Sequence, residues 1–168
     1  MPSIQRKQLI EEAWEKVHKL ERGFTLIEIL VSITLFAILV AIAVVISNPQ
    51  GQFARARNQQ RELHLSAIMN AVRQNIADTV NGSFTCGAGV IPAASTTMAV
   101  GGGNYDIAAC LVPTYLPTMP ADPNVSGAHY TSNADYDTGY KISRNASSGQ
   151  VTLWASGAEL SKVITITR

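Results

Sequence analysis

The sequence from Gly23 to Ile46, GFTLIEILVSITLFAILVAIAVVI, constrains this chain more than any other stretch. From Phe24 onward every residue in it is apolar or small except Glu28. As a helix rising about 1.5 Å per residue, the stretch would be roughly 35 Å long, which is enough to cross the hydrocarbon core of a bilayer. The sequence therefore predicts a membrane-spanning helix that carries one acidic side chain.

Glu28 is the feature that a simple anchor does not need. A carboxylate in hydrocarbon costs several kcal/mol unless a cation meets it, so a membrane-embedded Glu indicates a function. If the chain is cut after Gly23, Phe24 acquires a free α-amine, and that amine supplies the cation. The pair Gly23-Phe24 and the acid Glu28 are thus the first candidate functional residues.

The motif G-F-T-L-I-E followed by an apolar helix resembles the class III signal of type IV prepilins and type II secretion pseudopilins. Gly23 matches the residue before the cleavage point, and Phe24 matches the residue that becomes N-terminal and N-methylated. Glu28 matches the fifth mature residue. The resemblance covers about a quarter of the chain, and the remaining sequence fits it more loosely.

The resemblance implies a structural subunit of a type IV pilus-like filament, or the major pseudopilin of a type II secretion-like system. The implied partners are further copies of the chain, a prepilin peptidase and methylase, an inner-membrane assembly platform with its ATPase, and membrane lipid before assembly. The precursor would cross the inner membrane once and then join a surface pilus or a pseudopilus that spans the envelope. Roles in adhesion, motility, secretion and DNA uptake stay open.

Three other interpretations compete with this one. Residues before Gly23 could be the cytoplasmic tail of an ordinary single-span protein. Ala41-Ile42-Ala43 could direct signal peptidase I to cut before Val44, although the apolar run before it is long for a secretory signal and Glu28 would have no role. A protein of another class, a membrane-tethered module that binds DNA or a surface, would stay with membranes as a monomer, whereas filament subunits would be recovered after shearing.

The composition divides the chain into four expected segments. Residues 1–23 form a polar cytoplasmic leader, with Lys19 and Arg22 beside the apolar run as the positive-inside rule expects. Residues 24–47 form the filament-core helix, 48–82 its amphipathic continuation, and 83–168 the globular head. The leader carries the net charge of +1, and the balanced charge of the rest argues against nucleic-acid binding over the whole surface.

Asn48-Pro49-Gln50-Gly51 is expected to interrupt the helix, because proline lacks a backbone donor and glycine adds flexibility. Any melting would be confined to residues near 47–52. From Gln52 to Val80 the pattern predicts an amphipathic helix that packs on a sheet. Its expected apolar stripe is Leu65, Ile68, Met69, Val72, Ile76 and Val80, and its more polar positions are Arg55, Arg57, Arg61, Glu62 and Arg73.

Ser83 to Asn104 is rich in Gly, Ala, Ser and Thr, and it is expected to be a loop between helix and sheet. Cys86 and Cys110 flank it, and an even cysteine pair in an exported domain favours a disulfide over two free thiols. In the chain-entropy model, closing about 25 residues stabilises the fold by roughly 3–4 kcal/mol.

After a short helix from Ile107 to Tyr115, the segment Leu116-Pro117-Thr118-Met119-Pro120-Ala121-Asp122-Pro123 resembles the L-P-x-x-P-x-D-P segment of major pseudopilins. Four β-rich runs follow, separated by turn residues, and they predict an antiparallel meander: 129–131, 139–143, 151–154 and 163–167. The expected fold class is therefore α+β: a long N-terminal helix packed on a small antiparallel sheet, as in pilins.

Asp122, Asn124, Asp135 and Asp137 could supply oxygen ligands to calcium, but turn formation explains the same residues. No other cofactor is expected. The three histidines, His18, His64 and His129, lie in separate segments without a nucleophile elbow or a metal-binding helix motif. The sequence therefore predicts no enzyme.

Overall fold

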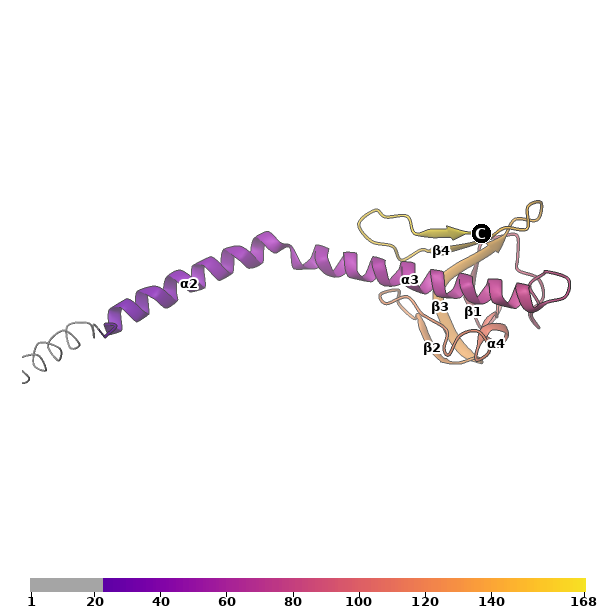
Figure 1. The fold of residues 1–168 in the computed structure, drawn as a ribbon, viewed down its shortest axis with the longest axis horizontal. Helices are drawn as coiled ribbons and strands as arrows, with labels where there is room; N and C mark the ends of the chain where they lie inside the picture. Colours follow the sequence, from indigo (N-terminus) through magenta and orange to yellow (C-terminus); the bar gives the residue numbers. More distant parts are fainter. Residues whose placement is uncertain (1–22) are drawn as a thin grey trace, which may run out of the picture. The chain divides into compact units, whose positions relative to one another are not determined.

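The computed structural model describes residues 23–168, and the leader predicted for residues 1–23 lies outside the described part except for Gly23. The chain divides into two compact units, one ending at Asn48 and the other running from Pro49 to Arg168 (Figure 1). The described part of the first unit is one helix with the three residues before it and Asn48 after it. The second unit holds a long helix and a five-stranded sheet.

The helix of the first unit, α2, spans Leu26–Ser47. None of its residues is buried, and it is the one helix in the described range that is long and apolar enough to cross a membrane. Its hydroxyl groups are satisfied within the helix: Ser32, Thr34 and Ser47 donate to backbone carbonyls three or four residues earlier, at 2.7 to 2.9 Å. The helix therefore offers a bilayer an almost wholly apolar surface.

The predicted interruption is a single residue long. Asn48, the C-cap of α2, has a left-handed backbone with φ of 42°, a conformation that Asn tolerates better than most residues. Helix α3 then begins at Pro49, where proline is favoured because the first helical residues need no N–H partner. The prediction of a restart at Gln52 was therefore wrong, and Gly51 lies inside α3.

Helix α3, Pro49–Asp78, covers one face of the sheet. Leu65, Ile68, Met69 and Val72 of the predicted stripe are buried, and Ile76 packs partly against the same core. Val80 was wrongly placed on this stripe: α3 ends at Asp78, and Val80 is fully exposed. The amphipathic pattern thus predicted the buried face correctly but extended the helix by two residues.

The sheet is antiparallel with strand order β1-β3-β4-β5, and β2 pairs with the beginning of β3. Four strands fall on predicted runs: β2 (His129–Ser132), β3 (Asp135–Arg144), β4 (Val151–Ala155) and β5 (Thr165–Thr167). Strand β1, Thr96–Ala99, was missed, because it lies in the Gly-rich segment assigned to a loop. Strands β2 to β5 each pair antiparallel with the next strand along the chain, so the predicted four-strand meander is confirmed, and β1 adds a further strand beside β3.

The core lies between α3 and the sheet. Tyr140 and Ile142 of β3 and Leu153 of β4 are fully buried, and they belong to the same cluster as the α3 stripe. The short helix predicted from Ile107 to Tyr115 is shorter in the structure: α4 spans Ala108–Leu111 and ends before Pro113, and residues 112–115 form a turn. A long helix followed by a small antiparallel sheet confirms the predicted α+β class.

Candidate processing and assembly site

Gly23, Phe24 and Thr25 precede α2 in an extended, exposed segment. A β-carbon built on Gly23 would meet no atom within 4 Å, so no contact inside the described chain requires glycine there. The described residues therefore give no packing reason for glycine at this position. Phe24 is 74% exposed.

Thr25 and Glu28 fix the start of α2. The Thr25 hydroxyl oxygen accepts a hydrogen bond of 3.2 Å from the Glu28 backbone N–H, which makes Thr25 the N-cap. The spacing T-x-x-E is that of a capping box, and it places the Glu28 carboxylate in the first helical turn, where the helix dipole favours negative charge. The N-cap was not predicted, although its sequence signature is plain.

The Glu28 side chain is exposed, and no ion pair within residues 23–168 involves it. Because α2 contains no Lys or Arg, the helix cannot neutralise Glu28 by itself. Within residues 23–168, Glu28 is therefore an acidic side chain without an ion-pair partner, in the first turn of an apolar helix.

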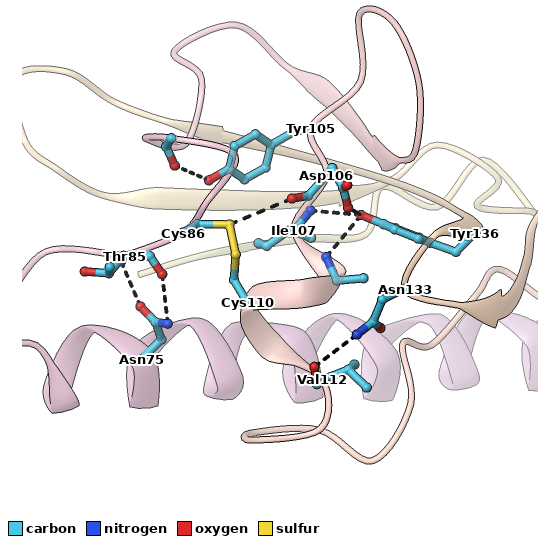
Figure 2. The surroundings of a disulfide bond; sticks show 12 residues. Asn75, Thr85, Cys86, Tyr105, Asp106, Ile107, Cys110, Val112, Asn133 and Tyr136 are labelled. Atoms are coloured by element: carbon cyan, nitrogen blue, oxygen red, sulfur yellow. Dashed lines mark hydrogen bonds between the residues drawn. A yellow bond between two sulfur atoms is a disulfide. The ribbon is translucent and has the colours of Figure 1, made fainter.

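The structure joins Cys86 to Cys110 by a disulfide (Figure 2). The bond ties the segment after α3 to the short helix α4. Asn75 of α3 reinforces this region by pairing with the backbone of Thr85: its amide donates to the Thr85 carbonyl at 3.1 Å and accepts from the Thr85 N–H at 2.9 Å. The phenol of Tyr105 donates to the Gly89 carbonyl at 2.7 Å. The predicted loop is therefore anchored at several points.

Arg61 departs from its predicted place on the polar side of the helix, because its side chain is completely buried. Its guanidinium donates to both Asp122 carboxylate oxygens, at 2.7 and 2.9 Å, and to Glu159 at 3.0 Å. Arg61 continues the apolar stripe four residues before Leu65, so the helical period itself pointed inward. A buried Arg needs such charged partners, since an unpaired ion inside a protein costs several kcal/mol.

Two further α3 residues bind the same acid. Arg57 donates to both Glu159 carboxylate oxygens, at 2.6 and 2.7 Å, and the Asn58 amide makes two bonds with the Glu159 backbone. Arg57 and then Arg61 lower the pKa of Glu159 to about 2. This cluster fastens the segments around residues 122 and 159 to α3.

Three of the four calcium candidates, the aspartates, have side-chain partners in the structure. Burial opposes ionisation of Asp122, but Arg61 and nearby backbone N–H groups hold its pKa below the usual range. Asp135 pairs with His129 at 3.1 Å, and Asp137 accepts the Gly139 N–H. The Asn124 backbone N–H bonds Asp122. Within residues 23–168, no group of three or more His, Cys, Asp or Glu side chains could hold a metal ion.

Two of the three histidines lie in the described part, and each has a structural contact. His64 bonds the Tyr140 hydroxyl at 2.9 Å, and burial lowers its pKa. His129 is exposed, and its contacts with the Gly127 carbonyl and Asp135 raise its pKa. His18 lies outside the described residues. His64 lies on α3 and bonds Gln60 and Tyr140, whereas His129 lies on β2 and bonds Gly127 and Asp135, so the structure does not pair the two histidines.

Comparison with known families gives one result, at the N-terminal end. A family model described as the prokaryotic N-terminal methylation motif matches residues 18–44. No curated protein and no solved structure matches the chain. The matched range contains Gly23, Phe24, Thr25, Glu28 and most of α2, which are the residues whose geometry is described above. The chain thus carries the N-terminal methylation motif that is the class III signal peptide of type IV pilins and pseudopilins.

Proposed function

We propose that this chain is a structural subunit of a type IV pilus-like filament. A prepilin peptidase would cleave between Gly23 and Phe24, and Phe24 would be N-methylated. The observation that carries this proposal is the start of α2: an exposed Gly-Phe segment leads into an apolar helix whose first turn holds Glu28 without an ion pair among the described residues. The precursor would occupy the inner membrane before the filament forms.

Assembly follows from the electrostatics of that first turn. Cleavage creates a positive α-amine at Phe24, and Glu28 of an incoming subunit attracts the amine of a neighbour. The attraction is strong where apolar helices exclude water, because the effective dielectric constant there is low. The remaining α2 surface packs by shape, since the hydrophobic effect supplies no net drive between helices that leave lipid. The ion pair therefore sets the register of adjacent subunits.

A secretion pseudopilus is the second candidate. The segment from Leu116 to Pro123 resembles that of major pseudopilins, and its Asp122 is the buried partner of Arg61. The loop bounded by Cys86 and Cys110 favours a pilus instead. Genes for an assembly platform and ATPase would be common to both systems, so a neighbouring retraction ATPase or secretin would discriminate between them.

The cleavage proposal is tested by mass spectrometry of the mature N-terminus. The wild-type chain should begin with N-methylated Phe24, and Gly23→Glu should block processing. Gly23→Ala is the matched control, because a β-carbon at residue 23 would meet no atom within 4 Å, and it should be processed more completely than Gly23→Glu. A mature product beginning at Met1 or at Val44 would contradict the proposal.

Assembly is tested separately with Glu28→Ala and Glu28→Lys. Both variants should still be cleaved, but filaments recovered by shearing should be strongly reduced. Ser32→Ala, one turn later on the same helix, should assemble as the wild type does, since the Ser32 hydroxyl bonds only its own backbone. A normal filament yield from Glu28→Ala would refute the ion-pair mechanism.

A further inference from the structure

The loop between β4 and β5, residues 156–164, is fastened to the first part of α3. Glu159 binds Arg57, Asn58 and Arg61, and Lys162 pairs with Glu62 at 2.6 Å. Figure 1 shows this loop extending beyond the strands alongside α3. The tip of the loop, Leu160 and Ser161, therefore lies between two contacts with α3, a part-buried one at Glu159 and an exposed one at Lys162.

The tip of this loop displays apolar side chains on a disfavoured backbone. Leu160 and Ser161 both have left-handed backbones, with φ of 58° and 56°, although neither is glycine. Leu160 is 56% exposed and Val163 is 81% exposed. Non-glycine residues in this region persist only where their surroundings enforce it, and they cluster at functional sites. The loop is therefore held in a form that presents Leu160 and Val163 outward.

An open hollow of about 520 Å³ lies against the same loop. Its polar lining comes from Lys141, Lys162, Ser95, Ser156 and Thr165, and its apolar wall includes Trp154 and Val163. No carboxylate lines the hollow. Lys162 forms an ion pair with Glu62, whereas Lys141 has no ion pair within residues 23–168. Ammonium and hydroxyl donors of this kind suit a phosphate group, and indole favours the interface between water and lipid.

The length of chain limits how far this surface can be from a bilayer. Arg57, which holds the loop through Glu159, follows Asn48 by nine residues of helix, or about 14 Å of rise. Asn48 itself ends the helix that would span the membrane. A bilayer that holds α2 is therefore within reach of the loop and the hollow.

We propose that the tip of the β4–β5 loop and the adjoining hollow form a docking surface for anionic phospholipid in the precursor. The phosphate of a headgroup binds at Lys141 and Lys162, and Leu160 and Val163 enter the apolar boundary beneath it. This inference depends on the membrane placement of α2 in the proposed function, and it adds a second contact between the chain and the bilayer. Cations and apolar side chains combined in this way are typical of surfaces that bind anionic lipid.

The test uses the full chain, one copy per nanodisc, which excludes contacts between copies. Single cysteines at Leu160→Cys and Val163→Cys carry an environment-sensitive dye, and quenching by doxyl-labelled lipid is measured. Val80→Cys is the matched exposed control, because Val80 lies just beyond the far end of α3. Phe36→Cys, in the middle of α2, is the control for membrane insertion. The nanodiscs contain phosphatidylcholine alone or mixed with phosphatidylglycerol.

The expected result is quenching at residues 160 and 163 well above that at 80, and stronger with phosphatidylglycerol. Lys141→Gln should lower the ratio of docked to undocked chains about fivefold in the anionic nanodiscs, which corresponds to about 1 kcal/mol per basic residue near such a surface. Arg73→Gln, an exposed cation near the other end of α3, should leave the ratio unchanged.

Three results would overturn the inference in different ways. If Phe36→Cys is quenched but residues 160 and 163 match Val80→Cys, the docking surface is wrong and the membrane helix stands. If Phe36→Cys is not quenched either, α2 does not insert, and both the docking surface and the proposed membrane precursor fail. Dye shielding at 160 and 163 that appears only when several copies share a vesicle would assign the surface to a second copy of the chain.

Discussion

Helices α2 and α3 follow one another with a single residue between them, yet they are stable for different reasons. In α2 no residue is buried, and its surface is apolar on every side. In α3 the apolar residues form one stripe against the sheet, and Arg61 within that stripe meets two carboxylates. The apolar surface of α2 therefore has no packing partner within the described chain, whereas the apolar stripe of α3 packs against the sheet of its own fold.

This difference shows what each helix contributes. A change on α3 should alter the folding of the head, because its side chains have fixed partners there. A change on α2 should alter insertion or assembly and leave the head intact.

Arg61→Ala should destabilise the head by about 3–5 kcal/mol, because it leaves the Asp122 carboxylate buried without its cation. The free energy of unfolding is measured by urea denaturation in detergent micelles, followed by Trp154 fluorescence in a Trp14→Phe background. Arg73→Ala is the control on the exposed side of the same helix, and it should change stability by less than about 0.5 kcal/mol. Equal effects of the two substitutions would show that the buried ion pair is not needed.

Leu65→Ala should destabilise the head by about 2–5 kcal/mol, since Leu65 is fully buried and its truncation leaves a cavity. Leu39→Ala makes the same chemical change in α2, where Leu39 is 65% exposed. In the same denaturation experiment, Leu39→Ala should leave the unfolding of the head unchanged. A comparable loss from both variants would contradict the division between the two helices.

Acid should weaken the attachment of the β4–β5 loop to α3. The pKa of Glu159 is lowered from 4.5 to about 2 by Arg57 and Arg61, so the folded state binds fewer protons than the unfolded state. The stabilisation is complete above about pH 4.5 and is lost as the pH falls towards 2. Denaturation midpoints measured across this range should decline less in Glu159→Gln than in the wild type, and parallel curves would count against the proposed pairing.

The smallest effect is expected at the start of α2. Thr25→Ala removes the oxygen that accepts the Glu28 N–H, which should cost about 1 kcal/mol locally. Hydrogen exchange at the Glu28 amide in micelles should then accelerate about fivefold, with no change in the head. Thr34→Ala is the control, because its hydroxyl bonds only the Val31 carbonyl. Unchanged exchange in Thr25→Ala would mean that other bonds fix the first turn.

The features that sequence predicted well depend on local pattern. An unbroken apolar run predicts α2, the 3.6-residue period predicts the buried face of α3, and alternating β-rich runs predict β2 to β5. The motif around Gly23 and Glu28 was also recognisable, because its function resides in consecutive residues. The roles proposed for these residues stay predictions until cleavage and assembly are measured.

The features that sequence did not predict depend on partners far along the chain. Strand β1 has four residues, and its pairing with β3 is a long-range contact that its Gly-rich surroundings obscure. Arg61 is charged, so composition assigned it to solvent, although its position on the helical period pointed inward. Its burial is favourable only because the fold brings the carboxylates of Asp122 and Glu159 to it. Glu159 is about a hundred residues further along the chain.

The internal hydroxyl bonds of α2 have a consequence for how the chain changes medium. The hydroxyl groups of Ser32, Thr34 and Ser47 donate hydrogen bonds to the backbone of their own helix. They therefore need no hydrogen-bond acceptor from the lipid or from a neighbouring protein. Moving α2 from one oily surrounding to another is then nearly neutral for every side chain but one. Whether α2 is more stable in lipid or in the filament would then depend on which of the two surroundings provides a counterion for the negative charge of Glu28.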